Sequence, residues 1–385
     1  MIFAAGWFEF HSLQMSGKVL DAQHSQALVS LAKALVDQEA AKLLVSPQKN
    51  DDGFWFGSGN IIEPEPGRFL LCGRYRNHGD SRTGTGAGAR GLEFAILEAT
   101  SPEGPFTKIR SFTKQDLSRE DAPVVSIEGG KLLAGPNGFE MFVSMEKGIC
   151  YPNGLESFQK PGTGVWSIDF MQATDVAGLG LGTMREAQSS RDGSTLHIKD
   201  PVVFDAPGGG TALAFCSHPF SWSSSNTGLA IRSEGADSFK MNTSCMIERG
   251  ATWDVACTRL TDRLAVPQVG RFASLPPLSL YFYDGAECLR ALDENPAAAK
   301  RPRGFSCEEL GGLAWGWDSE FPKIQRLSVD FPLFVSPHGT GCSRYVSTLA
   351  TSGAIMASWQ QSQSDLSQPL VGNLVKKEAI DGLLG

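Results

Sequence analysis

Three carboxylates occupy matching points of a recurring phrase, in which a small polar or acidic residue leads into a short apolar strand. They are Glu128 after Ser-Ile, Asp200 after Ile-Lys, and Asp330 after Ser-Val. Cleavage of an acetal needs one carboxylic acid to protonate the leaving oxygen and one carboxylate to act as base or nucleophile. A third carboxylate nearby can raise the pKa of the acid and orient it. The three residues therefore predict acid/base cleavage of a glycoside.

A second group of residues has side chains suited to holding a sugar. One stands at the matching point of a fourth phrase, and several arginines lie in or beside a long Gly-rich loop at 77–91. Guanidinium groups bind hydroxyls or carboxylates with two parallel hydrogen bonds. Indole rings offer an apolar face for stacking, and histidines offer neutral hydrogen bonds. The predicted substrate-binding residues are Asn60, Arg74, Arg76, Arg82, His218, Trp222 and His338.

The elements that must position these residues are short strands separated by Gly, Pro and Asn, repeated without long helices between them. Such a repeat predicts an all-β fold, a β-propeller, in which the first strand of each blade lines the central channel. The interval from Asp200 to Asp330 is nearly twice the others, so an unmatched blade is expected to begin near 278–283. Five blades fit best, and six or seven shorter blades remain an alternative. Segments 345–350 and 354–359 are expected as outer strands of the last blade, which a strand from the early chain would close.

The N-terminal region is the one clearly helical part. From Asp21, which suits an N-cap, leucines recur at helical spacing until a Ser-Pro pair at 46–47 ends the pattern. We therefore expect a short helical extension over residues 1–50 and a catalytic propeller over 51–385. The apolar stripe of the helix must cover either one face of the propeller or a second subunit in a homodimer, and the sequence leaves both open.

Composition excludes several classes of partner. The net charge of −8 disfavours nucleic acid, because phosphate binding needs a Lys/Arg surplus. No apolar run reaches the ~18 residues that cross a bilayer. The 8 cysteines contain no CxxC pair, which predicts reduced thiols in a cytoplasmic protein. Nucleotide, zinc-protease and serine-hydrolase motifs are also missing, so we expect neither a metal nor a cofactor.

The Asp-Pro strand entry at Asp200 and the related entry at Asp330 resemble those of the five-bladed propeller glycosidases, the superfamily of families 43, 32 and 117. The resemblance implies that Glu128 is the acid and that Asp200 or Asp330 is the base or the orienting residue. It also implies an enzyme that removes a terminal sugar from an oligosaccharide. The sequence departs from the family 43 pattern at Asn60, where that family would place its base.

A second resemblance is to the sialidase-type propellers. Segments 190–196 and 249–253 are similar to degraded Asp-boxes, and Arg74, Arg76 and Arg82 would supply an anion-binding cluster. This resemblance implies a hydrolase or a lyase that acts on an acidic sugar. A propeller that binds glycan without cleaving it is a further alternative.

Overall fold

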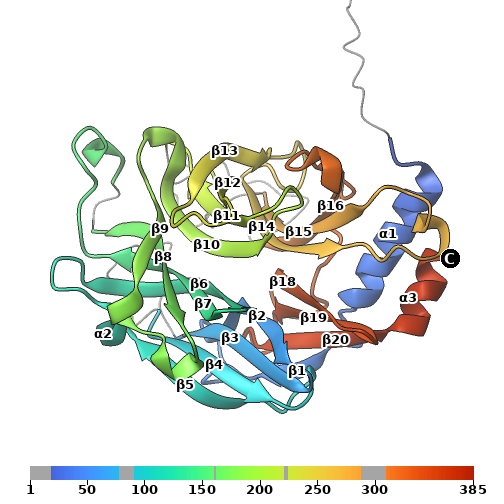
Figure 1. Ribbon diagram of the computed structural model, residues 1–385, viewed down its shortest axis with the longest axis horizontal. Coiled ribbons are helices and arrows are strands. Elements are labelled where there is room, and N and C mark those ends of the chain that lie inside the picture. Colours follow the sequence, from blue (N-terminus) through green and yellow to red (C-terminus); the bar gives the residue numbers. More distant parts are fainter. Residues whose placement is uncertain (1–18, 78–90, 160–161, 221–223, 288–308) are drawn as a thin grey trace, which may run out of the picture.

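The chain forms five four-stranded antiparallel sheets, each built mainly from consecutive strands (Figure 1). This arrangement comes from a computed structural model that describes residues 19–77, 91–159, 162–220, 224–287 and 309–385. The predicted five-bladed β-propeller is therefore confirmed, as is the short N-terminal helix. Within the described residues, no helix has the length and apolar character needed to cross a bilayer.

The strands of the first three blades follow one another along the chain, with the inner strand first in each blade. Blade 1 contains β2 (Trp55–Glu65), β3 (Arg68–Arg76), β4 (Glu93–Ala99) and β5 (Thr107–Thr113). Blade 2 contains β6 (Val124–Gly135), β7 (Gly138–Lys147), β8 (Val165–Ala173) and β9 (Arg185–Ser189). Blade 3 contains β10 (Leu196–Asp205), β11 (Thr211–His218), β12 (Asn226–Arg232) and β13 (Lys240–Ile247).

The last two blades complete the ring. Blade 4 contains β14 (Cys257–Ala265), β15 (Leu278–Ala286), β16 (Leu310–Trp317) and the very short β17 (Gln325–Arg326). Blade 5 contains β18 (Ser343–Ala350), β19 (Ala354–Gln361), β20 (Leu370–Lys376) and β1 (Lys42–Val45). The described helices are α1 (Ala22–Leu35), α2 (Lys114–Leu117), α3 (Lys377–Leu384) and the 3-10 turns η1 (Glu156–Phe158), η2 (Val176–Gly178), η3 (Leu181–Thr183), η4 (Gly193–Thr195), η5 (Gly270–Phe272) and η7 (Asp318–Glu320).

Blade 5 joins the two ends of the described chain. Strand β1 pairs antiparallel with β20, with Leu43 opposite Val371. A strand from the early chain therefore closes the ring, as predicted, and the fifth sheet draws on the segment before residue 50. Strand β18 is the inner strand of this blade, so the expectation that 345–350 is an outer strand is wrong. Because β1 supplies the outer strand of this blade, the strands β18, β19 and β20 fill the three inner positions, with β18 nearest the axis.

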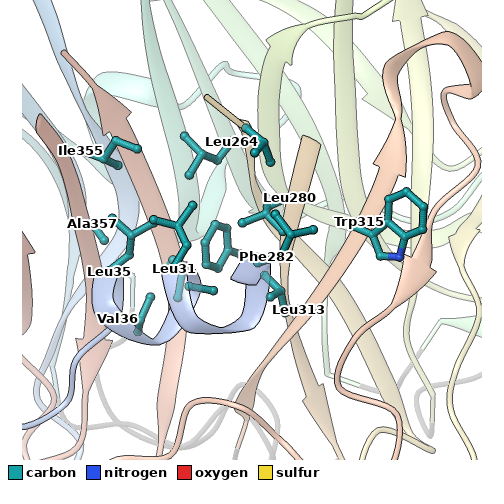
Figure 2. Packing of buried hydrophobic residues seen from close by; sticks show 14 of the residues in the cluster. Leu31, Leu35, Val36, Leu264, Leu280, Phe282, Leu313, Trp315, Ile355 and Ala357 are labelled. Atoms are coloured by element: carbon teal, nitrogen blue, oxygen red, sulfur yellow. The ribbon is translucent and has the colours of Figure 1, made fainter. Parts of the chain in front are cut away.

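Helix α1 begins at its N-cap Asp21, whose carboxylate accepts the backbone N–H of His24 at 2.9 Å. It packs beside α3 and against blades 4 and 5 of its own chain (Figure 1). Figure 2 shows residues of its apolar stripe facing strands of both blades. The labelled residues are Leu31, Leu35 and Val36 from the helical segment, Leu264, Leu280, Phe282, Leu313 and Trp315 from blade 4, and Ile355 and Ala357 from blade 5. The stripe is thus covered within one chain, and the structure offers no support for a homodimer through it.

Truncation of this stripe should destabilise the propeller. Leu31 is fully buried between the two blades, so Leu31→Ala removes its contacts and leaves a cavity. We expect a loss of about 2–5 kcal/mol in the free energy of unfolding. Lys33→Ala, on the exposed side of the same helix, should change it by less than about 0.5 kcal/mol. Chemical denaturation of the two variants measures both values, and equal small losses would show that α1 is not part of the cooperative core.

Candidate active site

Each inner strand of the propeller carries a β-bulge at which its pairing with the second strand shifts. The unpaired positions are 58–59 in β2, 128–129 in β6, 200–201 in β10, 261 in β14 and 345–346 in β18. Ser58, Asp200 and Tyr345 have positive φ values of 58°, 55° and 56°. Non-glycine residues rarely adopt such φ values, and those that do are concentrated at functional sites. The bulges therefore mark an equivalent position in each of the five blades.

The bulges bring two of the three predicted carboxylates together. Glu128 and Asp200 both occupy bulge positions and are only 6% and 5% exposed. Gly129 lies between the bulges of neighbouring blades, because a Cβ there would lie 2.0 Å from Ser58 Oγ and 3.1 Å from Asp200 Oδ1. The inner strands of blades 1, 2 and 3 thus approach one another so closely that only glycine fits at this point.

Asp330 does not join them. It lies on an exposed segment between β17 and β18, where Leu333 and Phe334 donate backbone hydrogen bonds to Gly311. The expectation that Asp330 lines the channel is therefore wrong. The phrase around Asp330 matches the others in sequence, but the chain here runs beside β16 rather than along the axis. The bulge position of the fifth blade belongs to Tyr345.

Asn60, predicted at the same repeat position, lies beyond the bulge of β2. Its side-chain amide bridges blades 1 and 2, since Nδ2 donates to Leu132 O at 2.8 Å and Oδ1 accepts from Leu132 N at 2.8 Å. Ser58 takes the bulge position instead. In this structure Asn60 holds two inner strands together.

Glu128 has a buried guanidinium partner. Arg74, on β3, forms an ion pair with Glu128 Oε2, and Ser126 Oγ donates to Oε1 at 2.9 Å. Arg74 is 4% exposed, so water screens this pair little. A close cation and a hydrogen-bond donor both stabilise the negatively charged carboxylate. Glu128 is thereby suited to a role that requires charge, as a base or a nucleophile.

Asp200 shares its guanidinium partner with two other carboxylates. Arg259, on β14, donates to Asp200 Oδ2 at 3.2 Å, to Asp284 Oδ2 at 2.7 Å and to Glu309 Oε2 at 2.7 Å. Arg344 donates a second bond to Glu309 at 2.6 Å. Two guanidinium groups therefore serve three carboxylates, and the surplus of negative charge favours the binding of a proton within this cluster.

The pKa values of Asp284 and Glu309 are shifted in opposite directions. Burial raises the pKa of Asp284 to about 6, with Arg259 opposing and Glu309 adding to the rise. Burial works in the same direction on Glu309, but Arg259 and Arg344 outweigh it and hold its pKa well below the usual range. The difference follows from position, because Asp284 is completely buried and has one arginine, whereas Glu309 is partly exposed and has two.

Asp284 should consequently make stability depend on pH. A folded-state pKa above the ordinary value means that the folded protein holds this proton more tightly than the unfolded chain. The resulting stabilisation is complete below about pH 4 and is lost as pH rises to about 6. With about 1.4 kcal/mol for each pKa unit, wild type should lose on the order of 3 kcal/mol relative to Asp284→Asn over this interval. Urea unfolding of both proteins at pH 4, 5, 6 and 7 checks this, and parallel curves would contradict it.

The indole ring of Trp55 contacts two guanidinium groups at the end of the channel where the inner strands begin. The Arg76 guanidinium carbon lies 4.6 Å from the centre of the Trp55 ring, and that of Arg344 lies 4.3 Å from it. Both arginines are less than a tenth exposed. Cation–π contacts of this kind hold charged side chains rigidly in a partly dry site. Arg74 and Arg76, two of the predicted binding residues, therefore border the Glu128 end of the channel on β3.

The remaining predicted binding residues lie in different places. His218 ends β11 and is 5% exposed, next to His197 at a ring-centre distance of 5.8 Å. Burial lowers the pKa of His218 to about 3 and Lys199 adds to this effect, so its imidazole is neutral at physiological pH. His338 lies in an exposed turn before β18. Arg82 and Trp222 lie outside the described residues.

Below the carboxylates the channel is blocked. A cavity of only about 10 Å³ remains among residues that include Ser58, Asp200, Thr261 and Tyr345. Under it, Lys131 Nζ donates to Gly59 O at 3.1 Å and to Ser347 Oγ at 3.2 Å. The space beside Asp200 is therefore too small for a sugar chain to pass through the channel.

A much larger cavity lies away from this site. It measures about 680 Å³ and is bordered by β13, β16 and the segment that leads to β17. Its lining includes Cys245, Trp315 and Arg326 but neither Glu128 nor Asp200. Its volume reflects the shortness of β17, which leaves the outer edge of blade 4 open. Size alone therefore does not indicate the reactive site. Within the described ranges, no group of His, Cys, Asp and Glu has a metal-binding arrangement.

Sequence reasoning missed five residues of the site, namely Arg259, Asp284, Glu309, Arg344 and Tyr345. Two of them had a usable signal. Asp284 interrupts an otherwise apolar strand, 278–286, and a carboxylate in such a strand must have a partner. Arg259 lies on β14, the inner strand of the unmatched blade, and the long interval between Asp200 and Asp330 signalled that such a strand exists. The prediction that this blade begins near 278–283 is wrong, because that segment is its second strand, β15. The other three join the site only through the packing of blades 4 and 5.

No protein-family model and no curated protein sequence matches the chain, but several solved structures do. A glycoside hydrolase among them is 11% identical with a TM-score of 0.57, covering 91% of this chain and 95% of its own. The α-L-arabinofuranosidase from Lactobacillus brevis is 10% identical with a TM-score of 0.52, covering 88% and 93%. The β-1,2-mannobiose phosphorylase from Listeria innocua, solved with β-1,2-mannobiose, is 11% identical with a TM-score of 0.52, covering 89% and 96%.

The chain has the five-bladed fold of these carbohydrate-active proteins. At such low identities the likeness establishes the architecture, and the chemistry has to be argued from the residues of this chain.

Proposed function

We propose that the protein is a glycoside hydrolase that removes a terminal sugar from an oligosaccharide. The observation that carries the proposal is the pair Glu128 and Asp200, on equivalent bulges of neighbouring inner strands, each bonded to a different arginine. Different surroundings for two carboxylates are what acid/base cleavage of a glycoside requires. The fold shared with an arabinofuranosidase supports the same interpretation.

The surroundings favour Asp200 as the acid and Glu128 as the base or nucleophile, the reverse of the assignment implied by the sequence resemblance. Glu128 pairs with Arg74, which keeps it charged. Asp200 shares Arg259 with Asp284 and Glu309, and its own contact with Arg259 is the longest of the three. Of the two reacting carboxylates, Asp200 therefore has the looser contact with its arginine.

In the proposed reaction, Asp200 gives its proton to the glycosidic oxygen as the bond from that oxygen to the anomeric carbon breaks. On the opposite side of the sugar, the Glu128 carboxylate either attacks the anomeric carbon, forming a glycosyl-enzyme that water then hydrolyses, or accepts a proton from the water that attacks this carbon. Arg74 holds Glu128 in place until then.

The blocked channel supports action at a chain end. Lys131 and the inner strands leave a cavity of only about 10 Å³ beside Asp200, which is too little for an oligosaccharide to thread through the channel. The charge balance also favours a neutral sugar over a uronate or a sialate. Arg74, Arg259 and Arg344 are all bonded to carboxylates of the protein, which leaves them little capacity to neutralise a substrate anion.

A screen of aryl glycosides and oligosaccharides tests the proposal directly. Release of a monosaccharide by wild type, but not by Glu128→Gln, would support it. Each assay is run with and without inorganic phosphate, because one protein of the same fold is a phosphorylase. Binding of an oligosaccharide without any release would leave a glycan-binding propeller as the better account.

The six cysteines among the described residues are free thiols, which fits the proposed cytoplasmic location.

A further inference from the structure

Tyr345 occupies, in blade 5, the bulge position that Glu128 and Asp200 occupy in blades 2 and 3. It holds a φ of 56°, which is costly for an aromatic residue and persists only where the surroundings enforce it. Asp284 holds this backbone conformation, because both of its carboxylate oxygens accept the backbone N–H of Tyr345, at 3.1 and 3.2 Å. A buried carboxylate thus fixes the strained backbone.

The side chain of Tyr345 is fixed as well. The Arg259 guanidinium carbon lies 4.1 Å from the ring centre, and that of Arg344 lies 5.2 Å from it. The phenol oxygen points at Asp200 Oδ1 from 3.5 Å. This is longer than the ~2.8 Å of a strong O–H···O bond, but catalytic contacts of this kind often shorten when substrate binds. Burial raises the pKa of the Tyr345 phenol, so the hydroxyl keeps its proton and acts as a donor.

We propose that Tyr345 is the positioning residue for Asp200 and that it turns the carboxyl group of this acid toward the glycosidic oxygen. The kinetic consequences of this inference rest on the proposed function, whereas the contact between the Tyr345 hydroxyl and Asp200 is independent of it. The Tyr345 hydroxyl donates to Asp200 Oδ1, and Arg259 donates to Oδ2. Two donors on different oxygens define the plane of the carboxyl group, whereas one donor would leave it free to rotate.

The test is Tyr345→Phe, which keeps the ring, the stacking on Arg259 and the backbone hydrogen bond to Asp284. We expect kcat on an oligosaccharide to fall by about 10- to 100-fold with little change in KM, as for a misplaced catalytic group. Tyr283→Phe is the matched control, since its buried hydroxyl bonds to Asp254 at 3.1 Å outside the site, and it should leave kcat unchanged.

A double variant shows whether Tyr345 acts through Asp200. On an activated aryl glycoside, adding Tyr345→Phe to Asp200→Asn should cost nothing further, because the partner is already lost. An additional loss in the double variant, or the same loss in Tyr283→Phe, would each overturn the inference.

A readout without activity separates this inference from the proposed function. Crystal structures of wild type and Tyr345→Phe should show the Asp200 carboxyl group rotated in the variant. An unchanged Asp200 overturns the positioning role. If wild type cleaves no glycoside, the proposed function fails, and this structural comparison decides the role of Tyr345 by itself.

Discussion

Glu128→Gln should lose activity about equally on natural oligosaccharides and on activated aryl glycosides, by about 10²- to 10⁴-fold. The reason is that a base or nucleophile is needed whatever the leaving group. Asp200→Asn should instead lose a similar factor on oligosaccharides but far less on aryl glycosides whose leaving groups need no protonation. The measurement is kcat/KM for each variant on one substrate of each kind.

The opposite pattern, with aryl glycosides spared by Glu128→Gln, would return the acid role to Glu128, as the sequence resemblance implies. Asp330→Asn is the control, because Asp330 is exposed and away from the bulges, and it should retain full activity. Full activity in both Glu128→Gln and Asp200→Asn, with folding intact, would rule out the proposed hydrolase at this site.

Arg259→Leu should be among the most destabilising single substitutions in the chain. The guanidinium group is 3% exposed and bonds to three carboxylates from three different elements or connections. Its removal leaves these carboxylates close together without a shared cation. Loss of one partner from a buried ion pair typically costs about 3–5 kcal/mol, and we expect at least that here. Thermal unfolding near neutral pH measures the loss as a lower Tm.

Arg191→Leu provides the comparison. Its ion pair with Glu186 is exposed at the surface, and its loss should cost no more than about 1 kcal/mol. The deficit of Arg259→Leu should also shrink at low pH, where protonation removes the charge of the carboxylates left without a cation. A deficit that does not depend on pH would show that packing, rather than charge, explains the effect of Arg259.

The carboxylates illustrate how far local sequence information extends. Glu128 and Asp200 are followed by Gly129 and Pro201, residues that break regular strand pairing, and the bulges form at these points. The recurring sequence pattern thus predicted the position of a β-bulge in two of the inner strands. Around Asp330 a similar phrase is followed by Pro332 but belongs to an irregular segment beside β16. Residue types alone do not distinguish a chain that follows the axis from one that runs along the edge of a blade.

The cluster around Arg259 lay beyond such reasoning for a different reason. Its members come from the first and second strands of blade 4, the connection before β16 and the inner strand of blade 5. Each ion pair forms across a large sequence separation, so no local pattern links its two members. The charged partners that distinguish the surroundings of Asp200 from those of Glu128 belong to this cluster.

By itself, the sequence determined the all-β repeat, the strand entries that carry Glu128 and Asp200, and the N-terminal helix. These features follow from turn residues, strand-forming residues and apolar spacing, all of which act over a few neighbouring positions. Only the tertiary structure decided that Tyr345 takes the fifth bulge, that Arg259 joins three carboxylates, and that α1 covers its own blades. Closure of the ring pairs β1 with β20 and leaves β18 as the inner strand of blade 5. All of these contacts join segments that lie far apart in the sequence, so no local pattern encodes them.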